Sequence, residues 1–89
     1  MEKKHFVYIL ETEHNMPYCG YTDDVERRFQ AHLNGTGAKF TRANKPLRIA
    51  YTKEFDTKSE ALKEEYRIKH LTKDKKLELI NSTQLRQTH

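Results

Sequence analysis

The amino-acid sequence predicts one small α+β domain with the order ββαβαα, a three-stranded antiparallel sheet flanked by helices. The prediction rests on β-rich segments near residues 6–21 and 47–52, on helix-capping patterns ahead of amphipathic stretches, and on chain length. The 89 residues allow one compact core but no second module with its own interior. Hydrophobic residues make up 35% and charged residues 34%, so a few amphipathic elements must supply the core. We expect the domain to span residues 1–80 and a frayed polar tail to span 81–89.

Two extended segments open the chain. Residues 6–10 are β-branched and aromatic, which predicts a strand largely buried on both faces. Residues 11–15 are polar and turn the chain. Residues 16–21 form a second extended segment, in which Gly20 allows a close backbone approach. Together the two segments predict a β-hairpin.

A helix is predicted over residues 24–33. Asp23 followed three residues later by Glu26 resembles a capping box with aspartate as the cap. The apolar residues at helical spacing predict the inward stripe, which consists of Val25, Phe29 and Leu33.

The stretch up to Pro46 is glycine-rich and basic, and it predicts a mobile loop rather than a core element. Residues 47–52 then alternate in the manner of a third strand. Thr57 with Glu60 predicts the start of a second long helix, and Thr72 is expected to cap a third. The inward residues of that last helix are Leu77 and Ile80.

Charge and cysteine content indicate the partner class and the compartment. Lys and Arg total 17 against 13 Asp and Glu, a formal charge of +4, which favours polyanionic partners such as nucleic acid. Cys19 is the only cysteine, so an intramolecular disulfide is excluded and a reducing cytoplasm fits. No apolar stretch has the length of a secretion signal or of a membrane span of ~20 residues. We expect a cytoplasmic protein with no membrane partner and no obligate protein partner.

Four residues near the predicted hairpin and first helix are candidates for chemistry. Tyr8 and Tyr18 come from neighbouring strands, so the hairpin brings two phenols together, and aromatic packing is the ordinary explanation for such a pair. Arg28 and His32 are four residues apart and share a helix face beside the apolar stripe. The alternatives are a solvated Arg28 paired with Asp24 and a His32 that only packs.

A carboxylate lies in the apolar sector of the second long helix. On a helical wheel Glu65 falls between Ala61 and Leu62, and a buried carboxylate requires a cation, an arginine or a metal. Glu64 lies at the other side of the stripe, so periodicity does not decide between the two. An ordinary salt bridge is the alternative explanation.

These motifs together resemble the GIY-YIG nucleases, and within them the small stand-alone bacterial group of YhbQ-like proteins (UPF0213). Phe6-Val7-Tyr8 stands where the family has Gly-Ile-Tyr, and Tyr18-Cys19-Gly20 where it has Tyr-Ile-Gly. Residues 24–29 with His32, residues 35–42 and residues 65–69 resemble the family's arginine helix, glycine-lysine loop and glutamate helix. The resemblance covers residues 6–80. Phe6 replaces the family's first glycine, a departure that removes no reactive group.

The resemblance implies a metal-dependent endonuclease that hydrolyses phosphodiester bonds in nucleic acid, with DNA repair or processing as the expected setting. Glu65 would be the metal ligand for a divalent cation, Mg²⁺ or alternatively Mn²⁺. Arg28 would stabilise the phosphate, Tyr8 or Tyr18 would be the base or orient the water, and His32 would assist.

The loop cations Lys39, Arg42 and Lys45 are expected to contact the nucleic-acid backbone, and DNA is favoured over RNA. A solvated basic surface is the alternative for these residues. Two other function classes stay open: a nucleic-acid-binding module with little or no cleavage activity, and a protein-interaction adaptor that uses the lysine-rich last helix.

Overall fold

The structure is a computed structural model that describes residues 4–87, with side chains described as far as Ser82. The predicted α+β class with a three-stranded antiparallel sheet is confirmed. The elements in chain order are β1 (His5–Thr12), a 3₁₀ turn (Glu13–Asn15), β2 (Tyr18–Thr22), α1 (Val25–Leu33), α2 (Lys39–Ala43), β3 (Pro46–Phe55), α3 (Lys58–Lys69) and α4 (Lys73–Gln87).

The sheet has the order β2-β1-β3, and both pairings are antiparallel. Because β1 is the central strand, residues 7–10 are buried on both faces, as the run of apolar residues predicts. The third strand is longer than predicted, since it continues to Phe55, opposite His5. The register places Gly20 directly opposite Tyr8.

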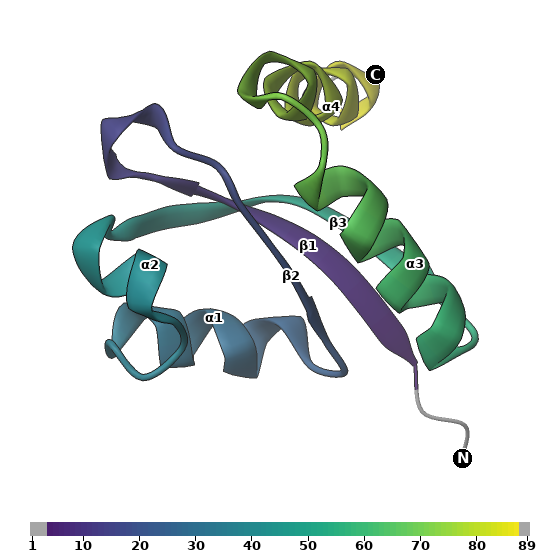
Figure 1. The fold of residues 1–89 in the computed structure, drawn as a ribbon, viewed down its shortest axis with the longest axis horizontal. Helices are drawn as coiled ribbons and strands as arrows, with labels where there is room; N and C mark the ends of the chain where they lie inside the picture. Colours follow the sequence, from purple (N-terminus) through teal and green to yellow (C-terminus); the bar gives the residue numbers. More distant parts are fainter. Residues whose placement is uncertain (1–3, 88–89) are drawn as a thin grey trace.

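Helices cover both faces of the sheet. In Figure 1, α1 and α2 lie on one side and α3 and α4 on the other. Val7 and Ile9 pack into a core with Ala61 and Ile68 of α3 and Ile80 of α4. Since side chains alternate along a strand, Tyr8 points to the opposite face, toward α1 and α2. The sheet therefore separates an apolar core from a more polar interior.

Helix α1 differs from the prediction at its cap and along its buried face. Asp24, not Asp23, is the N-cap, and its carboxylate accepts a hydrogen bond from the Arg27 amide. The prediction that Leu33 faces inward is wrong, because Leu33 is 38% exposed whereas His32 is 1% exposed. At 100° per residue, His32 lies on the same helix face as Val25, two turns earlier. Leu33, the next residue, is rotated away from that face.

Part of the predicted mobile basic loop is a helix. The prediction is wrong for residues 39–43, which form α2. Thr41 is 2% exposed, and Phe40 stacks on the ring of Tyr18. These two inward residues hold the short helix against the domain, while Lys39 and Arg42 remain on its exposed side.

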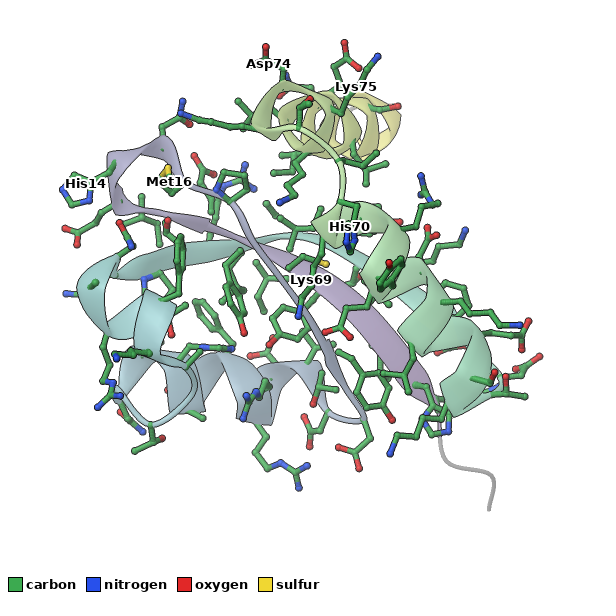
Figure 2. All side chains as sticks on the ribbon, viewed as in Figure 1. His14, Met16, Lys69, His70, Asp74 and Lys75 are labelled. Atoms are coloured by element: carbon green, nitrogen blue, oxygen red, sulfur yellow. The ribbon has the colours of Figure 1, made fainter. Side chains whose placement is uncertain are left out.

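The last two helices begin where the capping patterns predict. The Thr57 hydroxyl accepts from the Glu60 amide, and the Thr72 hydroxyl accepts from the Lys75 amide. Asp74 and Lys75 of α4 point away from the sheet (Figure 2). The predicted frayed tail is wrong for residues 81–87, whose backbone continues α4, and residues 88–89 lie outside the described chain. No helix in the described chain is long and apolar enough to cross a membrane.

Candidate active site

Tyr8 lies at the centre of the interior between the sheet and α1. Its side chain is 2% exposed, and its Oη is 2.8 Å from Nε2 of His32. A Cβ atom built on Gly20 would lie 2.4 Å from the same Oη. The close approach predicted at Gly20 is confirmed, and the group that approaches is the Tyr8 phenol.

His32 joins this phenol to α2. Its Nδ1 is 2.8 Å from Oγ1 of Thr41, so both ring nitrogens are engaged in the interior. Burial lowers the pKa of His32 below its ordinary value of 6.5, and the positive charge of Arg28 lowers this pKa further. The imidazole is therefore neutral near pH 7.

Tyr18 lies beside this pair but has different surroundings. Its ring centroid is 6.4 Å from that of Tyr8 and 5.1 Å from that of His32. The predicted proximity of the two phenols is confirmed. Within the described residues no hydrogen bond of the Tyr18 hydroxyl is seen, and its side chain is only half-buried. Tyr8 is thus buried and hydrogen-bonded, whereas Tyr18 is half-buried and contacts its neighbours through its ring.

Arg28 borders the same group of residues. Its Nη2 donates to the carbonyl of Gly37 at 3.1 Å, and Asp24, the partner expected for a solvated arginine, caps α1 instead. Burial raises the pKa of Tyr8 from 10 to about 12, even though the nearby Arg28 guanidinium acts in the opposite direction. The arginine is therefore placed to act on the phenol and on an anion beside it.

The structure does not join Glu65 to these four residues. Its carboxylate accepts from Lys69 at 3.2 Å, and its side chain is 19% exposed. Figure 2 shows Lys69 at the end of α3 that leads into α4. Among the described residues, no hydrogen bond, ion pair or ring contact is seen between Glu65 and the Tyr8 group. Glu64 is also partly buried, at 14% exposed, and it forms two hydrogen bonds with Arg67.

The oxygen donors near the site are compatible with one kind of divalent-cation site. In the described part of the chain no three His, Cys, Asp or Glu side chains converge as a metal cluster would require. A partly exposed carboxylate is a hard oxygen donor, and magnesium is commonly held by one or two carboxylates plus water and phosphate. Glu65 fits such a site, provided that the cation displaces the Lys69 ammonium.

A hollow of about 560 Å³ lies next to Arg28, at the outer edge of β2. Arg27, Arg28 and Lys58 contribute to its walls, and so does the carboxylate of Asp23, which pairs with Arg27 at 2.8 Å. Cations therefore exceed anions in its lining, and the hollow is cationic. His5 and Tyr21 line it as well, and they share a hydrogen bond of 2.7 Å. Arg27, Lys58 and Thr41 are not among the site residues predicted from the sequence. A pair of adjacent arginines was a usable signal for Arg27, but no local pattern marked the other two.

The chain is similar in sequence to known proteins over most of its length. Residues 4–78 match the sequence profile of the GIY-YIG catalytic domain, a stretch that includes every predicted site residue from Tyr8 to Glu65. A UPF0213 protein of Staphylococcus saprophyticus is 47% identical over 78 residues, which cover 88% of this chain and 95% of the relative. One from Oceanobacillus iheyensis is 49% identical over 80 residues, which cover 90% and 93%.

Two solved structures are similar to this chain. The solution NMR structure of a UPF0213 protein from Bacillus halodurans has 46% identity and a TM-score of 0.57, covering 88% of this chain and 83% of its own. The solution NMR structure of the protein EF2693 from E. faecalis has 39% identity and a TM-score of 0.62, covering 96% and 93%. The resemblance predicted from the motifs is confirmed.

Proposed function

We propose that this chain, which belongs to the GIY-YIG catalytic domain family, hydrolyses phosphodiester bonds in nucleic acid with the help of a divalent cation. The observation that carries the proposal is the Arg28 guanidinium beside the buried Tyr8–His32 hydrogen bond. A cation, a phenol and a neutral imidazole at one place can stabilise a phosphate and move a proton.

The pKa of Tyr8 decides how the phenol could act. With a pKa of about 12, only ~0.001% of the phenol is ionised at pH 7, a deficit of roughly 7 kcal/mol. A preformed phenolate is therefore a poor base in the resting protein. His32 Nε2, 2.8 Å away, is within reach of the phenolic proton. We infer that Tyr8 passes its proton to His32 as its oxygen takes one from the attacking water.

The remaining groups would act on the phosphate. The water oxygen forms its bond to phosphorus, the bond to the leaving oxygen breaks, and the leaving oxygen takes a proton from solvent. Arg28 offsets the charge that develops on the phosphoryl oxygens. Glu65 would hold the cation, whose chemistry is to neutralise charge on the phosphate and leaving oxygen. Tyr18, which is half-buried beside Tyr8 and His32, would orient the water or the substrate.

The cationic hollow and the exposed loop cations would hold the strand. Arg27 and Lys58 line the hollow beside Arg28, and Lys39, Arg42 and Lys45 are exposed near α2. Contacts from such residues to phosphates are independent of base sequence and weaken with salt. DNA is the substrate class we favour.

The test is to incubate purified protein with labelled single-stranded, duplex and branched DNA and with RNA, each with Mg²⁺, Mn²⁺ or EDTA. We expect cation-dependent cleavage that falls by about 10²–10³-fold in Arg28→Ala, the usual cost of removing one transition-state donor. Arg67→Ala is the matched control, because Arg67 pairs with Glu64 on the other face of the sheet. Equal loss in the two variants would contradict the assignment of Arg28.

One observation favours a second function, a nucleic-acid-binding module without useful cleavage. Glu65 is paired with Lys69, and in the described chain no hydrogen bond or ion pair joins it to the Tyr8 group. Salt-sensitive binding of all substrates with no cleavage under any cation would select this alternative. Absence of both binding and cleavage would exclude both functions.

A further inference from the structure

The hydrogen bonds around His32 have only one consistent direction. The Thr41 hydroxyl donates to the carbonyl of Ala38 at 3.1 Å, and a hydroxyl has a single hydrogen. Oγ1 of Thr41 therefore meets His32 Nδ1 as an acceptor, across a distance of 2.8 Å. The Nδ1 atom of His32 must carry the ring proton.

The same reasoning fixes the donor in the hydrogen bond between Tyr8 and His32. A neutral imidazole has one N–H and one bare nitrogen, so with the hydrogen on Nδ1 the Nε2 atom is bare. The Tyr8 hydroxyl then donates to Nε2, and its oxygen keeps its lone pairs for another group. The chain of donors runs from Tyr8 through His32 and Thr41 to the backbone of Ala38.

We propose that Thr41 is a positioning residue, which holds His32 in the tautomer whose Nε2 can accept the Tyr8 proton. The inference rests on the proposed function and deepens it. In the other tautomer an N–H would face the phenol, and the Tyr8 proton would have no acceptor. When Nε2 takes this proton the ring becomes an imidazolium, and Thr41 keeps its hydrogen bond from Nδ1–H in both states.

The packing of α2 supports this role. Thr41 is 2% exposed, and its neighbour Phe40 stacks on Tyr18 at a centroid distance of 5.7 Å. The helix is therefore anchored to two residues of the site, Tyr18 and His32. If the Thr41 hydroxyl turned away, Nδ1 of His32 would lose the partner it has in the interior, whereas the Ala38 carbonyl would still accept from the Arg42 amide.

The experiment is ¹⁵N NMR of the histidine rings together with the cleavage assay, in the parent, Thr41→Ser and Thr41→Val. Serine keeps the hydroxyl, whereas valine keeps the shape and removes it. We expect Nδ1–H in the parent and in Thr41→Ser, and a gain of Nε2–H in Thr41→Val. Cleavage should fall about 10- to 100-fold in Thr41→Val, part of the ~10²–10⁴-fold that acid–base catalysis supplies. Thr41→Ser should stay within a few-fold of the parent.

Thr36→Val is the matched control. The Thr36 hydroxyl is exposed and donates to the Ala31 carbonyl, so its loss should leave the His32 tautomer and the cleavage rate unchanged. An Nε2–H signal in the parent overturns the proposal, and this result needs no variant to fold. Parental cleavage by Thr41→Val also overturns it. If the parent cuts no nucleic acid, the proposed cleavage fails, while the tautomer of the parent and of Thr41→Val still decides the role of Thr41.

Discussion

Gly37 is the position at which the smallest change should disturb the site most. A Cβ atom at Gly37 would lie 2.3 Å from Nδ1 of His32 and 2.7 Å from its Cγ. Such contacts are far shorter than the ~3.5–4.0 Å at which non-bonded atoms attract. The ring cannot retreat, because it is 1% exposed and hydrogen-bonded through both nitrogens. Gly37→Ala must therefore move either His32 or the segment that leads into α2.

The expected cost follows from these contacts. Overpacking a well-filled interior costs roughly 1–3 kcal/mol, and each hydrogen bond lost from His32 adds about 1 kcal/mol. We expect Gly37→Ala to lower the free energy of unfolding by roughly 2–4 kcal/mol. A domain of this length has a total of roughly 4–13 kcal/mol, so the variant should stay mostly folded at room temperature over all but the lowest part of this range. Cleavage should fall along with stability, because the Tyr8–His32 pair is displaced.

The free energy of unfolding is measured by urea denaturation, and two control proteins make the test of Gly37→Ala specific. Gly35 has φ of +81°, but a Cβ atom added there would meet its nearest neighbour, Cγ of Arg42, at an ordinary 3.7 Å. Gly35→Ala should therefore cost only ~1–2 kcal/mol, from backbone strain. In a His32→Ala background the ring is gone, and Gly37→Ala should cost far less than in the parent. If Gly37→Ala is as mild as Gly35→Ala, or costs the same with and without the ring, the close approach to His32 is wrong.

Three other predictions address the cation, the binding surface and the buried histidine. Glu65→Gln should fold normally and lose cation-dependent cleavage, whereas Glu64→Gln should cleave like the parent, as a Mg²⁺ titration of both would reveal. Neutralising the three loop cations should flatten the salt dependence of duplex binding, measured by fluorescence anisotropy. The slope of log K against log [salt] should fall by up to about 2.7, at ~0.9 per lost phosphate contact. An unchanged slope would place the binding surface elsewhere. These cations are Lys39, Arg42 and Lys45. Because burial lowers the pKa of His32, the unfolded chain binds its proton more readily, so stability should be complete above pH 6.5 and fall as the pH drops through the folded pKa. Urea denaturation at pH 7.5 and 5.5 should show a larger loss for the parent than for His32→Gln, and equal losses would refute this reasoning.

Several features were predictable from the sequence because their causes are local. The central strand follows from a run of residues that are apolar on both faces, and the start of α3 follows from Thr57 and Glu60, which are three residues apart. The approach of Tyr8 to Tyr18 was also predictable, since a hairpin joins the two strands. In each case the interacting groups are separated by a short stretch of chain.

Other features depend on contacts between distant segments, and the sequence pattern was wrong about them. A hydrophobicity pattern assigns Leu33 to the core and His32 to its margin, but hydrogen bonds to Tyr8 and Thr41 satisfy both His32 nitrogens, so the histidine is buried. Helix α2 has only five residues, too few for a clear period, and it forms because Phe40 and Thr41 pack against the site.

The sequence by itself determined the fold class, the family motifs and the three residues that the structure gathers around Tyr8, namely Tyr18, Arg28 and His32. Periodicity could not choose between Glu64 and Glu65, because Glu65 lies within the apolar sector of the helix and Glu64 at the other side of the same stripe. Only the tertiary structure assigned Glu64 to Arg67 and Glu65 to Lys69. The direction of the hydrogen bonds through His32 was likewise decided only in three dimensions, because it requires a strand, a helix and the short α2 to bring their polar groups within bonding distance.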